Sequence, residues 1–328
     1  MSVLIVTEQQ SGVWHKMSWE ALAAGQQVAR ALGKDAAACV VGSGVGNLAN
    51  ELAAKKLDRV YLLEHELLKA YTPDGYTIAL RTLIEKVKPQ LVLFPHTYRV
   101  RDFGPKLAAS QQRPFISDSI AVRVDGNELL FVRQLFQGKL HADVKPAGDP
   151  PYFASLQAGS YRADTLEPGD APAPVEPVGV SLTPEQIRMR PQEPFQEAAG
   201  GVDLSTAPVI VSVGRGIKDP ENIPLAEKLA KALGGELGAS RPICDSGWLP
   251  LERQIGSSGQ TVSPKLYVAL GISGAIQHVV GMKGSRTIVA INKDRSAPIF
   301  EIADYGIVGD LFEVVPALTE AIEEIKKS

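Results

Sequence analysis

Uninterrupted apolar runs that alternate with helical patterns dominate the first half of the chain. Residues 3–6, 38–41, 60–63 and 91–95 are apolar throughout, rather than at every second position. A strand with one face in water alternates apolar and polar residues, whereas a strand covered on both faces does not. Helical patterns are expected over residues 19–32, 48–54 and 103–110. We therefore predict an α/β fold with an open, mainly parallel sheet.

The pattern changes between residues 120 and 190. The runs at 128–132 and 152–156 have no helix between them and are expected to extend the sheet with antiparallel strands. Residues 167–177 contain four prolines and no packing pattern, which predicts extended and largely solvated chain. A short strand pair is expected between Val178 and Arg190.

Strand and helix patterns alternate again after residue 207. Strands are predicted at 208–214, 266–270 and 287–291, and helices at 225–233 and 312–327. A length of 328 residues suits two domains. We expect an N-terminal α/β domain over 1–190, a linker over 191–207 and a second open-sheet domain, Rossmann-like in layout, over 208–328.

Charge and composition narrow the functional classes. A net charge of −3 argues against nucleic-acid binding, and no apolar run reaches the length of a membrane span. The two cysteines, Cys39 and Cys244, are far apart and lack a CxxC frame, and the histidines lack metal-ligand spacing. No metal site is therefore expected, and the predicted location is a reducing cytoplasm, bacterial or archaeal in preference to the mitochondrial matrix.

One motif in the first domain suggests a different function. Gly42–Asn47 follows a predicted strand and opens a helix, and Glu64 ends the next strand, as in a dinucleotide site. However, Asn47 occupies the place of the third glycine, and the motif follows the second strand instead of the first. A tight turn is the favoured interpretation. An NAD-dependent dehydrogenase that uses the Gly42–Gly46 turn stays as the alternative, and a non-redox nucleotide-binding module is a third possibility.

Small and polar residues cluster after the strands of the second domain. The clusters are residues 238–241, 254–259, 271–278 and 292–294, and a further cluster precedes the last helix. Parallel strands end at one edge of a sheet, and open α/β sheets bind ligands outside that edge. Each loop alone could be a simple turn, and Asp310 a simple helix cap. Together they predict a nucleotide-type cofactor.

Several segments of this domain resemble the alpha subunit of electron transfer flavoproteins. They are residues 266–278, 281–283, 288–294, 297–300 and 303–306. The resemblance implies an electron carrier without substrate chemistry of its own, one FAD per heterodimer, and a beta subunit that holds AMP. It also implies that the first domain contacts this partner and holds no cofactor. Electrons would pass from acyl-CoA dehydrogenases to a quinone oxidoreductase, as in fatty acid oxidation.

The resemblance also assigns residues to the cofactor. Arg241 would lie over the flavin and favour its negatively charged states. His278 would lie near the pyrimidine end of the flavin, either protonated or as a neutral hydrogen-bond donor. Ser258 would lie near flavin N5, although a shift of one residue would give Ser257 this role.

The other expected cofactor contacts have no redox-tuning role. Ser240 would bind phosphate, and Asn292, Lys293 and Asp310 would bind the adenosine end. The remaining members lie in the loops around the cofactor: Gln254, Gly256, Ser273, Gly274, Ala275 and Gln277. No residue is expected to act as a catalytic acid, base or nucleophile.

Overall fold

The computed structural model describes residues 2–126, 128–136, 138–192 and 203–326. The chain forms two compact units, residues 1–194 and 195–328. Residues 193–202 of the expected linker lie outside the described residues. Leu204 and Ala207 are buried in the core of the second unit, so the packed chain of that unit begins before residue 208. Among the described residues, no helix is long and apolar enough to cross a membrane.

The first unit is built on a nine-stranded sheet with the order β11-β5-β4-β1-β6-β10-β7-β8-β9. Pairing is parallel from β11 to β7 and antiparallel from β7 to β9. The strands are β1 (Val3–Val6), β4 (Ala36–Gly42), β5 (Arg59–Glu64), β6 (Leu91–Pro95), β7 (Phe115–Asp125), β8 (Glu128–Leu135), β9 (Leu140–Val144), β10 (Tyr152–Leu156) and β11 (Val175–Pro177). A separate hairpin pairs β2 (Gln9–Gln10) with β3 (Val13–Trp14).

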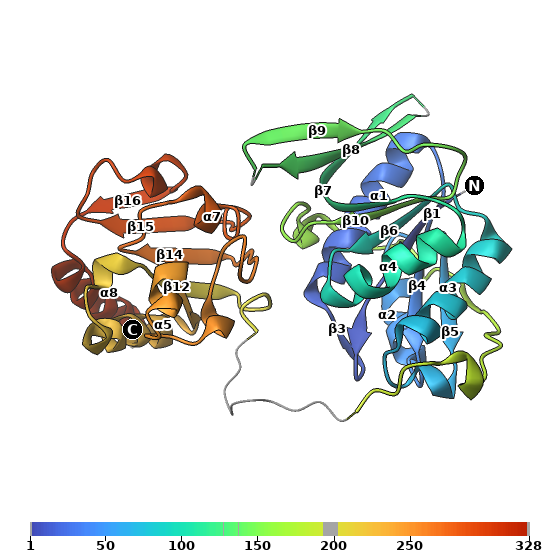
Figure 1. The fold of residues 1–328 in the computed structure, drawn as a ribbon, viewed down its shortest axis with the longest axis horizontal. Helices are drawn as coiled ribbons and strands as arrows, with labels where there is room; N and C mark the ends of the chain where they lie inside the picture. Colours follow the sequence, from blue (N-terminus) through green and yellow to red (C-terminus); the bar gives the residue numbers. More distant parts are fainter. Residues whose placement is uncertain (1, 127, 137, 193–202, 327–328) are drawn as a thin grey trace. The chain divides into compact units, whose positions relative to one another are not determined.

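Helices cover both faces of this sheet (Figure 1). α1 (Lys16–Leu32) and α2 (Gly46–Ala53) enclose one apolar core, and α3 (Pro73–Val87) and α4 (Tyr98–Ser110) enclose the other. Single turns of 3-10 helix are η1 (Glu66–Leu68), η2 (Ala163–Thr165) and η3 (Pro184–Gln186). Except for the partly buried Leu62, the uninterrupted apolar runs are buried because both faces of the sheet are covered, which confirms the predicted fold class.

No helix is predicted from the sequence where α3 lies. Thr72 caps α3 by accepting a hydrogen bond from Gly75 N, and Pro73 occupies the first turn. Both are recognised helix-start signals, but the segment also carries Gly75 and the β-branched residues Thr77 and Ile78, which weaken the helical pattern. Burial against β4 and β6 decides the conformation.

The expected antiparallel extension is half correct. β8 is antiparallel, but β10 is parallel to both β6 and β7 and lies between them. After β9 the chain returns and inserts β10 into the centre of the sheet. Phe153, Ala154, Ser155 and Leu156 are consequently buried, as in the other central strands.

The prediction for residues 167–190 is wrong in part. The proline-rich segment is extended, and Ala173 is its one buried residue, but the segment also forms the edge strand β11 beside β5. The strand pair expected after Val178 is absent from the described residues. Val178 and Leu182 pack into the core beneath α3, and Arg188 bonds to the carboxylate of Asp74. This segment has few apolar residues, so its packing depends on single anchors that periodicity does not detect.

The second unit has a five-stranded parallel sheet with the order β13-β12-β14-β15-β16. The strands are β12 (Val209–Val213), β13 (Glu236–Ala239), β14 (Leu266–Leu270), β15 (Ile288–Asn292) and β16 (Tyr305–Val308). In chain order this is the 2-1-3-4-5 arrangement of doubly wound folds, in which the order of the strands reverses between the first and third strands.

The two faces of this second sheet are covered differently. α5 (Ile223–Leu233) and α8 (Leu311–Ile325) pack on one face (Figure 1). The other face is covered by side chains of connecting segments, including Ile255, Val262 and Met282. Short helical elements complete the unit: η4 (Arg215–Ile217), η5 (Pro220–Asn222), α6 (Arg241–Asp245), η6 (Leu251–Arg253), α7 (Ile276–Val279) and η7 (Pro298–Glu301).

Candidate cofactor site

The expected cofactor residues follow the carboxyl ends of the second unit's strands. Ser240 follows β13, the loop at 271–275 follows β14, Lys293 follows β15 and Asp310 follows β16. Because all the strands are parallel, these positions share one edge of the sheet. The order of the strands reverses between β12 and β14, and doubly wound sheets bind ligands outside the carboxyl ends of the strands at this point.

The glycines after β14 serve close packing. Gly271 has φ of 60°, and a Cβ there would lie 2.6 Å from the Cα of Gly216. Gly274 has φ of 90°, and a Cβ there would lie 2.2 Å from Ile299 N. These glycines bring the loop after β14 against η4 and η7. Their conformation follows from protein packing.

A second loop, residues 254–262, packs tightly against α7 and is hydrogen-bonded to it. Gly256 has φ of 144°, and a Cβ there would lie 2.8 Å from the carbonyl oxygen of Gln277. Ser257 N donates to the same carbonyl at 2.7 Å. Further along, Val262 N donates to Gly281 O at 2.8 Å. The loops after η6 and β14, which are distant in sequence, therefore form one packed piece, which we call the cofactor ledge (residues 254–262 and 271–283).

A buried side chain of the cofactor ledge fixes one exposed hydroxyl through a hydrogen bond. Gln254 is 4% exposed, and its Nε2 donates to Ser258 Oγ at 3.1 Å. Both Ser257 and Ser258 are exposed, but only for Ser258 does the structure show a buried side chain that fixes the hydroxyl. Ser273, Ala275 and Gln277 are also exposed on the ledge. This small polar surface beside buried polar support suits a planar, hydrogen-bonding ligand.

His278 lies inside the protein. Only 6% of it is exposed, and its Nε2 is 2.8 Å from the hydroxyl of Tyr267. Among the described residues its Nδ1 is buried without a hydrogen-bond partner. Burial lowers the pKa of His278 to about 4, and the Ile255 backbone opposes this only in part. Of the two states left open for this residue, the structure supports the neutral ring.

Ser240 and Arg241 directly follow β13. Ser240 is 7% exposed and precedes α6, and its side chain makes no capping bond to that helix. The Arg241 side chain is 66% exposed and pairs with Asp245 at 3.1 Å, one helical turn later. Such an exposed pair contributes little stability, so the guanidinium can leave it for an anionic ligand at small cost.

The three residues expected at the adenosine end differ in their surroundings. Asn292 donates to Ile272 O at 3.0 Å and accepts from Asp294 N at 3.0 Å. Asp310 caps α8 by accepting from Phe312 N at 2.9 Å, which is its simplest structural role. Lys293 is exposed. Asn292 and Asp310 therefore stabilise the loops at the carboxyl edge of the sheet.

Sequence reasoning missed the partner of His278. Tyr267 is the largest fully buried side chain of the second unit and lies in the apolar run of β14. The signal available was a hydroxyl in an otherwise apolar strand, because a buried tyrosine usually finds a hydrogen-bond partner.

The glycine turn of the first unit has a structural explanation. Glu64 Oε1 accepts a hydrogen bond from Val45 N at 2.6 Å and so closes the turn. Gly44 has φ of 67°, which favours glycine whatever the turn binds. The acid that a dinucleotide site would use for ribose is therefore engaged by the turn itself.

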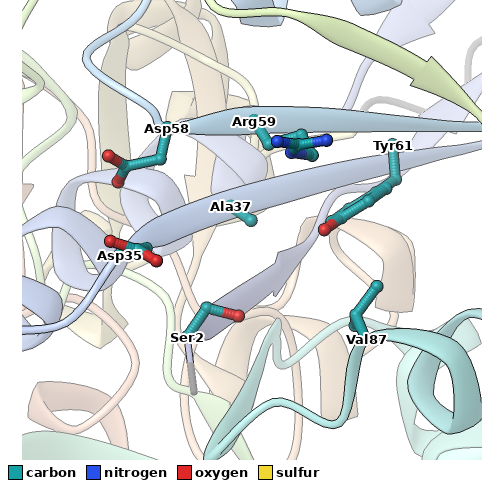
Figure 2. Close-up of a pocket in the computed structure, with 7 residues that line it drawn as sticks. All are labelled: Ser2, Asp35, Ala37, Asp58, Arg59, Tyr61 and Val87. Carbon is teal, nitrogen blue, oxygen red and sulfur yellow. The ribbon is translucent and has the colours of Figure 1, made fainter.

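The first unit has a surface hollow at the amino ends of its strands. It is lined by Ser2, Asp35, Asp58 and Arg59 beside the starts of β1, β4 and β5 (Figure 2). Parallel sheets bind ligands at the opposite ends of their strands. Among the described residues, no group of three or more His, Cys, Asp or Glu side chains could hold a metal.

The fold and the ledge define a two-unit α/β protein with a nucleotide-type site on its second unit. The electron transfer flavoprotein FAD-binding domain matches residues 203–283, and the electron transfer flavoprotein domain matches residues 3–182. The chain belongs to the electron transfer flavoprotein alpha-subunit family, which confirms the resemblance of the sequence.

Relatives match over nearly the whole chain. It is 42% identical to an electron transfer flavoprotein subunit alpha of Bacillus subtilis, with 98% of each chain covered. It is 38% identical to a protein FixB of Clostridium saccharobutylicum, covering 98% of this chain and 96% of the relative. It is 36% identical to an acryloyl-CoA reductase electron transfer subunit beta of Anaerotignum propionicum, covering 99% and 96%.

Proposed function

We propose that this chain is the FAD-holding alpha subunit of a heterodimeric electron transfer flavoprotein. It binds one FAD on its second unit, and a beta subunit that holds AMP completes the heterodimer. It accepts electrons from flavin dehydrogenases of the acyl-CoA dehydrogenase type and delivers them to a quinone oxidoreductase. The relative named as an electron transfer subunit of an acryloyl-CoA reductase supports a donor that acts on acyl-CoA thioesters.

The observation that carries the proposal is the cofactor ledge. Two loops are locked together by Gly256 and the Ser257–Gln277 hydrogen bond, at the edge where a doubly wound sheet binds nucleotides. An enclosed imidazole and a supported hydroxyl lie within it. These features fit a flavin, whose ring is planar and carries hydrogen-bonding atoms on one side.

FAD would supply the one-electron and two-electron chemistry, and the chain would tune it. Arg241 carries a permanent positive charge, so it favours the negatively charged reduced cofactor. Ser258 would offer its hydroxyl near N5, with the orientation that Gln254 imposes. Ser240 would contact phosphate, and Lys293 would act at the adenosine end. Each of these residues binds or orients the cofactor, and none attacks a substrate.

The chain is therefore proposed to be an electron carrier that works in the bacterial or archaeal cytoplasm. The first unit would contact the partner without holding a cofactor of its own. Its two domains would be residues 1–190 and a second domain that begins by Leu204 and not at residue 208, because Leu204 and Ala207 are buried in the core of that domain.

Electron transfer can be tested with the purified heterodimer under anaerobic conditions. An acyl-CoA dehydrogenase reduced by its substrate should bleach the visible flavin absorbance of the heterodimer within seconds, and dehydrogenase that lacks acyl-CoA should not. Bleaching by NADH alone, with no response to the reduced dehydrogenase, would contradict the proposed donor class and favour a pyridine-nucleotide enzyme.

A further inference from the structure

His278 of the cofactor ledge forms a buried pair with Tyr267. Tyr267 is fully buried in β14, and its hydroxyl lies 2.8 Å from Nε2 of His278 in α7. The ring centroids are 6.1 Å apart and the rings are tilted by 57°, so the pair meets through its polar atoms and not by stacking.

Both side chains are neutral at neutral pH. Burial lowers the pKa of His278 to about 4 and raises the pKa of Tyr267. The hydrogen bond between them can then have two directions. Either the tyrosine donates to Nε2 and the ring hydrogen lies on Nδ1, or Nε2–H donates to the tyrosine oxygen and Nδ1 carries a lone pair.

The number of polar groups left unpaired favours the first direction. Among the described residues, His278 Nε2 is the hydrogen-bond partner of the Tyr267 hydroxyl, and both Ser212 Oγ and His278 Nδ1 are buried without a partner. If the tyrosine donates to Nε2, its hydrogen is paired and only Nδ1–H is left without an acceptor. If Nε2–H donates instead, the tyrosine hydrogen and the Nδ1 lone pair are both left unpaired, and each buried unpaired group costs free energy.

We propose that Tyr267 is a positioning residue that donates to Nε2 of His278 and thereby keeps the ring hydrogen on Nδ1, which has no acceptor among the described residues. The consequence rests on the proposed function. His278 would present a neutral donor to the cofactor side of the ledge, and would add no positive charge there. In histidines generally, the hydrogen-bond partner of one ring nitrogen determines which nitrogen carries the hydrogen.

Nitrogen NMR of the intact heterodimer tests this directly. With 15N-labelled histidine, we expect His278 to show a protonated Nδ1 and an unprotonated Nε2 that do not titrate between about pH 6 and 8. Tyr267→Phe should reduce the excess of this tautomer by about fivefold or more, the worth of one hydrogen bond. Tyr76→Phe, a buried tyrosine of the first unit, should leave it unchanged.

A pair of substitutions at His278 gives an independent readout. The side-chain amide of asparagine can imitate Nδ1, whereas that of glutamine can imitate Nε2. His278→Asn should therefore keep the midpoint potential of the flavin closer to the parent value than His278→Gln does. Adding Tyr267→Phe to His278→Asn should not move the potential further, because the donor no longer depends on the tyrosine.

Three results would overturn the proposal. They are an Nε2–H tautomer or a charged ring in the parent protein, an unchanged tautomer in Tyr267→Phe, or an equal potential in the two His278 variants. If Tyr267→Phe does not fold, the other two results still decide. If the heterodimer binds no FAD, the proposed function fails, while the NMR result still establishes or refutes the tautomer.

Discussion

His278 couples the stability of the second unit to pH. Its folded pKa of about 4 lies below the ordinary value of 6.5, so the unfolded chain binds the extra proton first. The free energy of unfolding should therefore fall as pH drops from about 6.5 toward 4, by up to a few kcal/mol. His278→Gln should flatten this dependence, and His141→Gln, at an exposed position, should keep it. Hydrogen exchange of β12 and β14 amides reports the change; an equal slope in both variants would refute it.

Arg241 is the one exposed cation that the account assigns to redox tuning. Arg241→Ala should lower the midpoint potential of the flavin by roughly 60 mV, a tenfold change for one electron, because a fixed positive charge is lost. Arg241→Lys should retain part of the effect. Arg286→Ala, an exposed arginine just before β15 and so at the opposite edge of the sheet, is the matched control. Potentiometric titration that gives equal shifts for Arg241→Ala and Arg286→Ala would argue against the assignment.

At the scale of elements, Gly256 joins the two halves of the cofactor ledge. Gly256→Ala would place a methyl group 2.8 Å from Gln277 O at φ of 144°, so one loop must move. We expect a loss of roughly 1–3 kcal/mol of stability and at least tenfold weaker FAD binding. Gly44→Ala has a left-handed φ of 67° in open space, in the turn of the first unit. It should cost about 1 kcal/mol and leave FAD binding unchanged. Fluorescence titration of FAD separates the two, and equal losses would mean that the ledge is not the site.

The elements that the sequence predicted well are those whose signal is local. The apolar runs of β1, β4, β5 and β6 are visible in the sequence because both faces of each strand are buried. The direction of β10 was predicted wrongly because it was inferred from the lack of a helix between this run and the preceding one, and not from the burial of residues 153–156 on both faces of the sheet. The loops of the site were located by composition, yet their conformation depends on contacts such as Gly271 with Gly216. Tyr267 was missed because its role depends on a residue brought near only by folding.

At the scale of the whole molecule, Asp74 holds the segment around Arg188, near the end of the first unit, against the rest of that unit. Its buried carboxylate bonds to Lys106 and to both the backbone and the side chain of Arg188, which holds its pKa well below the usual range. Asp74→Asn should weaken these bonds by about 1–3 kcal/mol and raise the rate of tryptic cleavage after Arg188 by at least tenfold. Asp164→Asn, which breaks an exposed pair with Arg162, should not. Equal cleavage rates in both variants would show that Asp74 is not the anchor.

The central claim also concerns the whole molecule: the second unit of this family member is proposed to hold FAD within a heterodimer. The most direct measurement is the identity of the flavin released when the purified complex of this chain and its beta subunit is denatured. We predict a yellow complex that releases one FAD per heterodimer, and a Gly256→Ala complex that releases less. A colourless complex that does not take up added FAD would contradict the account.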